Sequence, residues 1–301
     1  MRRDVSFKSK GLTCRGWLYE PSALTEGTTA PAIVMAHGFS GVKELDLGRF
    51  AEPFAEAGFV TLVFDYRYLG ESDGEPRAQV LFREQQEDYR NAITWLSQQP
   101  VVDAARIGVW GTSYSGGHVL YLSAFDRRIK AAVAQVPAIG TWRSLVAQHG
   151  VEALRMMLAL TTADREARYP HDEPTYMPVV APPGQPAVLG TPDAYDWFVA
   201  GATEQAPTWR NEVTIESVEQ LVEYDPAAAI ELISPTPLLM VAAENDTLIP
   251  LASVREVFER AGEPKALKTV PCGHFDVYHD EPYHSDVLTA ELEWFKEHLA
   301  G

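Results

Sequence analysis

Cysteine is scarce in this 301-residue chain, which has only Cys14 and Cys272, far apart in sequence. They form neither a CxxC pair nor the dense disulfide framework of a small secreted domain. With 46% hydrophobic residues, the chain can bury a large core without metals or crosslinks. We therefore expect a protein of a reducing compartment, folded as one large domain or two smaller ones.

Long apolar runs are also missing, since no window approaches the roughly 18 consecutive apolar residues of a spanning helix. The N-terminus, MRRDVSFKSKGL, is basic but has no apolar stretch behind its charges, so we expect no secretory signal. These features predict a cytoplasmic protein that does not act at a membrane.

Basic residues are outnumbered, with 25 Lys and Arg against 42 Asp and Glu and a formal net charge of −17. Nucleic acids and anionic membranes both attract proteins with a basic face. The balance therefore argues against either partner. Solubility is the simplest interpretation of the acidity, with a high-salt habitat or a cationic substrate as alternatives.

Short apolar runs rich in β-branched residues alternate with helical patterns. Their continuous apolarity is typical of strands covered on both faces, as in a parallel sheet, and the alternation predicts a doubly wound α/β fold. Two more polar runs near the N-terminus, VSFKSK and LTCRGWLYE, predict an antiparallel hairpin at the sheet edge. The six apolar runs lie at 31–38, 59–66, 106–111, 129–137, 237–246 and 266–271.

Helical patterns at 83–99 and 285–300 each carry their apolar residues on one side. In the C-terminal pattern these residues recur at spacings of four, three and four, which predicts one buried stripe with Ser285 as the N-cap. The members of that stripe are Leu288, Leu292, Phe295 and Leu299.

The alternation breaks once, over residues 138–230. A helical pattern there is followed by seven of the chain's 21 prolines, between Pro170 and Pro192. Such a stretch can be neither a regular helix nor a central strand. We expect an inserted, mainly helical cap over an α/β core formed by residues 1–137 and 231–301.

Ser113, in RIGVWGTSYSGG, has the surroundings that a nucleophile elbow requires. A predicted strand precedes it, a helical pattern follows at once, and the residues two positions away, Gly111 and Ser115, are small enough for the sharp turn. The start of the helix would also favour negative charge at the serine. We predict Ser113 as the nucleophile, with the Ser115 hydroxyl satisfying a backbone group.

Ser72, in GESDG, matches the G-x-S-x-G spacing literally. However, EPRAQV follows it, with a proline and no helix. Glu71 and Asp73 would also oppose a developing oxyanion. We interpret this stretch as a loop.

Partners for the serine follow in the order acid, then histidine, that this kind of triad requires. Asp246 comes just after a predicted strand, with Glu244 as the alternative acid. His274 lies in a loop past the next strand. Its rivals, His279 and His284, fall on the run into the last helix, where we expect them at the surface.

An oxyanion hole needs two converging N–H groups. One would come from Tyr114, directly after the nucleophile. The other would come from Phe39, in the HGF sequence after the strand at 31–38, where Gly38 lets the backbone approach closely. We interpret His37 as a structural residue.

The motifs HGF, DYRYLGESDG, GTSYSGG, ENDTLIP and CGHF, in this order and spacing, resemble the serine α/β-hydrolase superfamily over residues 5–137 and 231–299. The likeness is greatest to the branch of dienelactone-hydrolase-like enzymes, X-prolyl-peptidase-like esterases and hydrolases that trim polyketide chains. Ser115 replaces the second motif glycine, and Tyr68 stands where relatives often have glycine. Relatives with an aspartate nucleophile resemble this chain in fold only. Dienelactone hydrolases proper use cysteine, and Cys272 is not at the elbow.

This resemblance and the triad predict a serine hydrolase that cleaves a carboxylic ester of a small-to-medium apolar substrate through an acyl-enzyme, without metal or organic cofactor. Cleavage of an amide, a thioester or a C–C bond beside a carbonyl, and acyl transfer, stay open. Peptidase relatives usually carry an extra β-domain for which this chain has no room, so ester cleavage leads. A non-catalytic binding protein on the same fold is the remote alternative. Whether the chain forms a homodimer is also open.

The cap is rich in aromatic residues and methionine, which supply apolar surface. Most of them would fasten the cap to the core, while some must line a substrate cleft and would favour an apolar or aromatic acyl or alcohol group. Our candidates for substrate contact are Trp142, Met156, Tyr176, Trp197 and Trp209.

Overall fold

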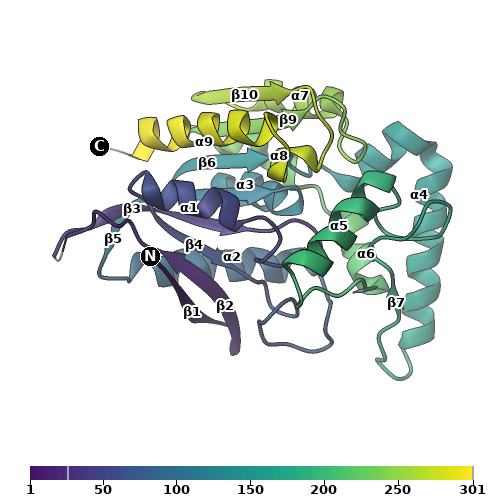
Figure 1. Ribbon diagram of the computed structural model, residues 1–301. Helices are drawn as coiled ribbons and strands as arrows, with labels where there is room; N and C mark the ends of the chain where they lie inside the picture. Colours follow the sequence, from purple (N-terminus) through teal and green to yellow (C-terminus); the bar gives the residue numbers. More distant parts are fainter. Residues whose placement is uncertain (26, 300–301) are drawn as a thin grey trace.

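The centre of the protein is an eight-stranded, mostly parallel sheet with helices on both faces, as seen in a computed structural model that describes residues 1–25 and 27–299 (Figure 1). The six predicted apolar runs all form parallel strands, which confirms the doubly wound α/β fold. In sheet order they are β4 (Val60–Phe64), β3 (Ala30–Ala36), β5 (Val102–Thr112), β6 (Ile129–Gln135), β9 (Leu238–Ala243) and β10 (Lys265–Val270).

The predicted N-terminal hairpin forms one edge of this sheet. β1 (Arg2–Ser9) pairs antiparallel with β2 (Leu12–Tyr19), and β2 pairs antiparallel with β4. Exposed and buried residues nearly alternate along both strands, because only one face of the hairpin meets the core. The outermost strand can therefore be polar, while the central strands are apolar and buried over most of their length.

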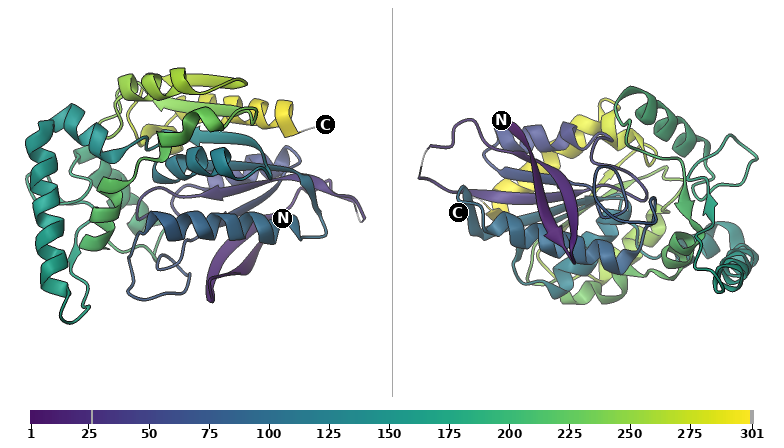
Figure 2. Two further views of the ribbon diagram at one scale, coloured as in Figure 1. Left: turned by 180° about the vertical axis from the view of Figure 1, so that it is seen from behind. Right: turned by 90° about the horizontal axis from the view of Figure 1, so that it is seen from below.

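Helices cover the sheet on two sides (Figures 1 and 2). α1 (Gly48–Glu56) and α9 (Tyr283–Leu299) lie on one face, with the short α8 (Asp276–His279) leading into α9. α2 (Phe82–Ser97) and α3 (Tyr114–Phe125) lie on the other face. α7 (Leu251–Arg260) packs beside β9.

The last helix differs from its predicted orientation. It begins at Tyr283, so Ser285 lies in the first turn and is no N-cap; its Oγ donates to Glu281 Oε1 at 2.8 Å. Leu288 and Leu292 are half-buried. The residues that face the sheet are His284, Val287, Glu291, Phe295 and Leu299. Phe295 and Leu299 of the predicted stripe are thus buried as expected, while Val287 and Glu291 are more buried than Leu288 and Leu292.

The insertion holds the cap, which stands at the carboxyl ends of the parallel strands (Figures 1 and 2). Its longest helix, α4, is broken at Gly150, whose φ of 79° is outside the helical range. The prolines between Pro170 and Pro192 lie in turns and irregular chain, apart from Pro192 at the start of α5. The cap elements are α4 (Thr141–Arg168), β7 (Tyr176–Met177), α5 (Pro192–Glu204), β8 (Val213–Thr214) and α6 (Ile215–Glu223). The 3₁₀ helix η1 (Pro226–Leu232), which follows them, packs against α3.

Across the described part of the chain, none of the helices combines the length and the apolarity that crossing a membrane would require.

Candidate active site

Ser113 occupies a sharp turn between β5 and α3. Its φ of 54° and ψ of −114° lie outside the regions that L-residues favour, as in a nucleophile elbow. Gly111 has no room for a Cβ, because the backbone of Ser115 lies against it. The turn therefore projects Ser113 at the carboxyl end of a central strand, beneath the cap.

Two loops bring a carboxylate and an imidazole to this serine. His274 Nε2 lies 3.1 Å from Ser113 Oγ, and His274 Nδ1 lies 2.6 Å from Asp246 Oδ2. With Nδ1–H donating to the carboxylate, Nε2 is left to accept the serine proton. The other oxygen, Asp246 Oδ1, accepts the N–H groups of two residues in its own loop, Leu248 at 2.8 Å and Ile249 at 2.7 Å.

The imidazole and the carboxylate are shielded from solvent, with side-chain exposures of 1% and 2%. The alternative acid, Glu244, is exposed. His279 is also exposed in part and contacts Asp46. His284 corrects our expectation of a surface residue, because it is buried edge-on against the ring of Phe50.

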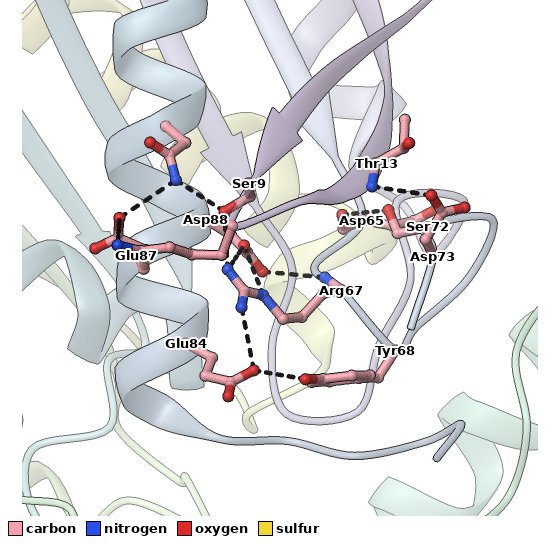
Figure 3. A network of polar contacts seen from close by, with 12 residues as sticks. Ser9, Thr13, Asp65, Arg67, Tyr68, Ser72, Asp73, Glu84, Glu87 and Asp88 are labelled. Atoms are coloured by element: carbon pink, nitrogen blue, oxygen red, sulfur yellow. Dashed lines mark hydrogen bonds and ion pairs between the residues drawn. The ribbon is translucent and has the colours of Figure 1, made fainter. Parts of the chain in front are cut away.

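Ser72, the serine of GESDG that matches the G-x-S-x-G spacing, holds a loop in place. Ser72 Oγ donates to the Asp65 carbonyl at 2.6 Å and accepts the Arg15 N–H at 2.9 Å. The Asp73 carboxylate accepts the Thr13 N–H at 2.9 Å (Figure 3). These contacts fasten the loop to β2, as the interpretation of this stretch as a loop requires.

Tyr68, in the same loop, has a φ of 71°, in the region that favours glycine. Its hydroxyl donates to Glu84 on α2 at 2.8 Å. Next to it, Arg67 makes a buried ion pair with Asp88 and donates to Ser9 (Figure 3). Tyr68 therefore serves to hold the loop against α2.

The backbone N–H groups of Phe39 and Tyr114 are candidates for the oxyanion hole. Among hydrogen bonds of the described residues, neither group donates to a protein acceptor. The two rings pack edge-to-face, 5.5 Å apart, which sets the loop after β3 beside the start of α3. A Cβ on Gly38 would come within 3.1 Å of Ser113 Cβ, so only glycine lets that loop pass so close.

Ser115 links the two backbones of this candidate oxyanion hole. Its hydroxyl donates to the His37 carbonyl and is 2.7 Å from the Tyr66 hydroxyl. As expected from the sequence, it satisfies a backbone group. A serine in place of the second motif glycine thus ties the elbow to the loop that carries Phe39.

A polar cluster that the sequence did not indicate lies below the elbow. His118 Nδ1 is 2.9 Å from the Tyr224 hydroxyl, and His118 Nε2 is 3.0 Å from Gln85 Oε1. Burial lowers the pKa of His118 to about 3, and it also lowers the pKa of His37. Both imidazoles are therefore neutral near pH 7 and have other partners, whereas His274 Nε2 contacts the Ser113 hydroxyl and is placed to act as its base. These partners come from separate segments, so no local motif reveals them.

Two cavities meet at Ser113. The small chamber has a volume of about 40 Å³, and the large chamber, which lies beneath the cap, has about 380 Å³. Both are bordered by Phe39, Ser113, Leu189 and Leu248. The small chamber is further lined by Leu45, Leu47, Trp197, His274, Phe275 and Tyr278. The large chamber is lined mainly by apolar residues, among them Ile139, Leu145, Val188, Leu221 and Ile249.

Of the five cap residues predicted to contact substrate, only Trp197 lines either chamber. Met156 is 74% exposed on α4, and Tyr176 is exposed on β7. Trp142 lies beneath the Arg143 guanidinium, at 4.4 Å. Trp209 stacks on a neighbouring ring and donates from Nε1 to the Ser40 carbonyl at 3.0 Å. Composition indicated apolar surface in the cap but not which side chains turn inward.

The residues that border the large chamber are mostly aliphatic, and the sequence analysis did not single them out. Leu145 lies in the first segment of α4, before the break at Gly150. Val188 and Leu189 follow the proline-rich stretch. Their only sequence signal is their place inside the insertion. In residues 1–25 and 27–299, no three His, Cys, Asp or Glu side chains gather in a way that could hold a metal ion.

Comparison with known proteins agrees with the fold and the motifs. Residues 16–276 match the family model of X-Pro dipeptidyl-peptidase (S15 family). The quorum-quenching protein AidA of Acinetobacter baumannii is 32% identical over 97% of this chain and 94% of its own length. A thiohydrolase of Eupenicillium brefeldianum is 32% identical over 97% of this chain and 92% of its own length. The crystal structure of the α/β-hydrolase GrgF from Penicillium sp. sh18 matches with a TM-score of 0.85 and 31% identity, covering all of both chains.

The fold, the elbow and these relatives define the protein as a serine α/β-hydrolase. Within that class, the chain belongs to the X-Pro dipeptidyl-peptidase (S15) family, whose model covers most of its length.

Proposed function

We propose that this hydrolase cleaves a carboxylic ester through an acyl-enzyme formed on Ser113. The observation that carries the proposal is the 3.1 Å contact between His274 Nε2 and Ser113 Oγ, at the junction of two largely apolar chambers. Asp246, bonded to the far side of the imidazole, would hold its tautomer and stabilise the imidazolium.

The reaction runs in two halves. Ser113 Oγ bonds to the acyl carbon while its proton moves to His274 Nε2, and that proton passes to the leaving oxygen as the ester C–O bond breaks. Water then attacks the acyl-enzyme, gives its proton to His274, and releases the acid and the free serine. The Phe39 and Tyr114 N–H groups would stabilise the oxyanion in both halves, one such donor being worth roughly 3–4 kcal/mol.

Thioester hydrolysis is the second candidate. It is favoured by the likeness, over 97% of this chain, to a protein named thiohydrolase. The same Ser113 and His274 would act, with sulfur in place of the leaving oxygen.

The proposed nucleophile can be identified with a fluorophosphonate probe and mass spectrometry, alongside turnover of methyl butanoate. We expect the label on Ser113 and turnover by the wild type. Ser113→Ala should lose both, while Ser72→Ala should keep both, because Ser72 lies in the loop held to β2. A label absent from Ser113, or full turnover by Ser113→Ala, would refute the assignment.

We also propose a cytoplasmic location. Cys14 and Cys272 are both free and buried. Burial raises the pKa of both thiols, so neither is activated for disulfide exchange.

A further inference from the structure

The two chambers at Ser113 differ in the catalytic groups that border them. His274 forms part of the wall of the small chamber, and Tyr114 forms part of the wall of the large chamber. Phe39 borders both. The proton carrier thus faces one side of the reacting carbon, and one candidate oxyanion donor faces the other.

This asymmetry determines which half of a substrate occupies which chamber. In acylation, His274 Nε2 gives a proton to the leaving atom, and in deacylation it takes one from the incoming acceptor. Because the same nitrogen does both, the leaving group and the acceptor must occupy the same side. We therefore propose that the small chamber receives the leaving group and then the acceptor, while the large chamber holds the acyl chain. This inference rests on the proposed function.

The volumes then set the substrate class. A cavity of about 40 Å³ exceeds the roughly 10–15 Å³ that one water needs but leaves little space beyond a methyl-sized group. The large chamber, at about 380 Å³ against about 40 Å³, is roughly nine times larger on the same measure. The site fits an ester of a medium-length apolar acid with a compact alcohol. It also fits water as the acceptor, and so favours hydrolysis over transfer to a bulky alcohol.

Two side chains from different parts of the fold close the small chamber. Trp197, on cap helix α5, stacks on Phe275 with 5.1 Å between ring centroids, and it also contacts the ring of Tyr278 at 4.9 Å. Leu45 comes from the core loop after β3 and is 1% exposed. Truncating either side chain should enlarge this chamber without changing the large one.

A crossed set of esters and variants tests the assignment. One series keeps methanol as the leaving group and varies the acid from butanoate to octanoate to dodecanoate. The other keeps octanoate and varies the alcohol from methyl to butyl to 2-phenylethyl. Alkyl esters are used because an alkoxide needs the proton from His274, whereas p-nitrophenolate leaves without one. The variants are Trp197→Ala, Leu45→Ala and, to fill the large chamber, Leu145→Trp.

For the wild type we expect kcat/KM to fall at least about tenfold from the methyl to the 2-phenylethyl ester, as is usual when a group does not fit a pocket. Trp197→Ala and Leu45→Ala should each remove most of that fall and leave the acid preference unchanged. Leu145→Trp should lower kcat/KM for octanoate about tenfold relative to butanoate and leave the alcohol preference unchanged. Circular dichroism checks that each variant is folded. If loss of the Trp197 indole destabilises α5, Leu45→Ala tests the small chamber in its place.

The failures are distinguishable. If Leu145→Trp changed the alcohol preference and Trp197→Ala changed the acid preference, the small chamber would hold the acyl chain and the large chamber the leaving group. Turnover with no dependence on alcohol size would overturn the inference and leave the proposed ester hydrolysis intact. A fluorophosphonate label on Ser113 without turnover of any of these esters would keep Ser113 as the nucleophile but overturn both ester cleavage and the assignment of the small chamber to a compact leaving group. The absence of both label and turnover would refute the proposed function itself.

Discussion

At the scale of single residues, the loop after β9 contains two carboxylates with different surroundings. Asp246 is bonded to His274, whereas Glu244 is exposed. Asp246→Asn removes the charge that stabilises the imidazolium and disturbs its tautomer, so kcat for methyl butanoate should fall by roughly 10⁴-fold. Glu244→Gln should leave kcat close to the wild-type value. Equal losses in the two variants would contradict the assignment of the acid.

Glu291 allows a specific prediction about how stability depends on pH. It is fully buried in α9 and accepts a hydrogen bond from Trp110 Nε1 at 2.9 Å. Burial raises its pKa well above the usual range, despite that hydrogen bond. The folded protein thus keeps this proton at pH values where the unfolded chain has lost it. Stability attributable to this group is therefore full below the unfolded pKa, near 4.5, and decreases as pH rises above it.

Glu291→Gln removes the titration and keeps an oxygen for Trp110. The free energy of unfolding of this variant, relative to the wild type, should rise between pH 5 and 8, by up to about 1.4 kcal/mol per pH unit. Urea unfolding at several pH values measures how the stability difference between variant and wild type changes with pH. This change is the test, because the new amide N–H₂ has a burial cost that shifts the difference by the same amount at every pH. A difference that stays constant with pH would show that Glu291 is charged in the folded protein.

Asp246 and Glu291 also show which features of the protein the sequence predicts and which it does not. The triad residues stand directly after strands, and parallel strands end at one edge of the sheet, so the order of motifs was enough to predict that they meet. Glu291 was not predicted, because its burial depends on an indole in β5, far away in sequence. Apolar spacing alone therefore placed Phe295 and Leu299 correctly, but it missed Glu291 among the buried residues of α9.

At the scale of elements, the loop after β3 is held by a buried charge network. Lys43 donates from Nζ to Asp65 at 2.7 Å and to Glu71 at 2.6 Å, and its backbone N–H also donates to Asp65 at 2.7 Å. Burial disfavours the lysine charge, but the two carboxylates outweigh this and raise the pKa of Lys43. The network lies in the loop that carries Phe39, so it fixes the position of that candidate oxyanion donor.

Breaking this network on one side should be costly. Asp65→Asn leaves the buried lysine without its main counter-charge, and we expect the free energy of unfolding to fall by about 3–5 kcal/mol in urea titrations. Replacing both partners, in Lys43→Met/Asp65→Asn, should recover part of that loss, because no unpaired charge stays buried. Lys43→Met is measured alone as well. If the losses of stability from Lys43→Met and Asp65→Asn simply added up in the double variant, the two side chains would not be coupled.

Elements of the core were predictable to within a few residues, whereas in the cap the sequence indicated only the helical pattern that forms α4, and not the other elements. Core strands have continuous apolar runs of limited length, so their pattern is local. In the cap, α4 breaks at Gly150, and the proline-rich stretch takes its shape from contacts such as Leu189 N–H with the Val179 carbonyl. Which side chains face Ser113 then depends on how these segments dock, and that information is not local.

At the scale of the whole molecule, the cap and the core share one hydrophobic cluster. The cap residues Phe198, Val213 and Val218 belong to the same contiguous set of buried residues as the strands of the sheet. Polar contacts join the same parts: Val80 N–H donates to Ser217 Oγ at 2.7 Å, and Gln86 Nε2 donates to the Tyr224 hydroxyl at 2.8 Å. An insertion fastened in this way is expected to unfold together with its core rather than as a separate domain.

Differential scanning calorimetry can test this cooperativity. A single transition, with the calorimetric enthalpy equal to the van't Hoff enthalpy, is expected for one cooperative unit. Phe198→Ala, a truncation at the boundary between cap and core where the ring packs on Phe275, should lower the temperature of that single transition without splitting it, because the lost contacts stabilise both parts. Two resolved transitions, or a Phe198→Ala shift confined to one of them, would show that the cap folds independently. The small chamber, walled by Trp197 from the cap and Leu45 from the core, would then depend on how firmly the two units dock.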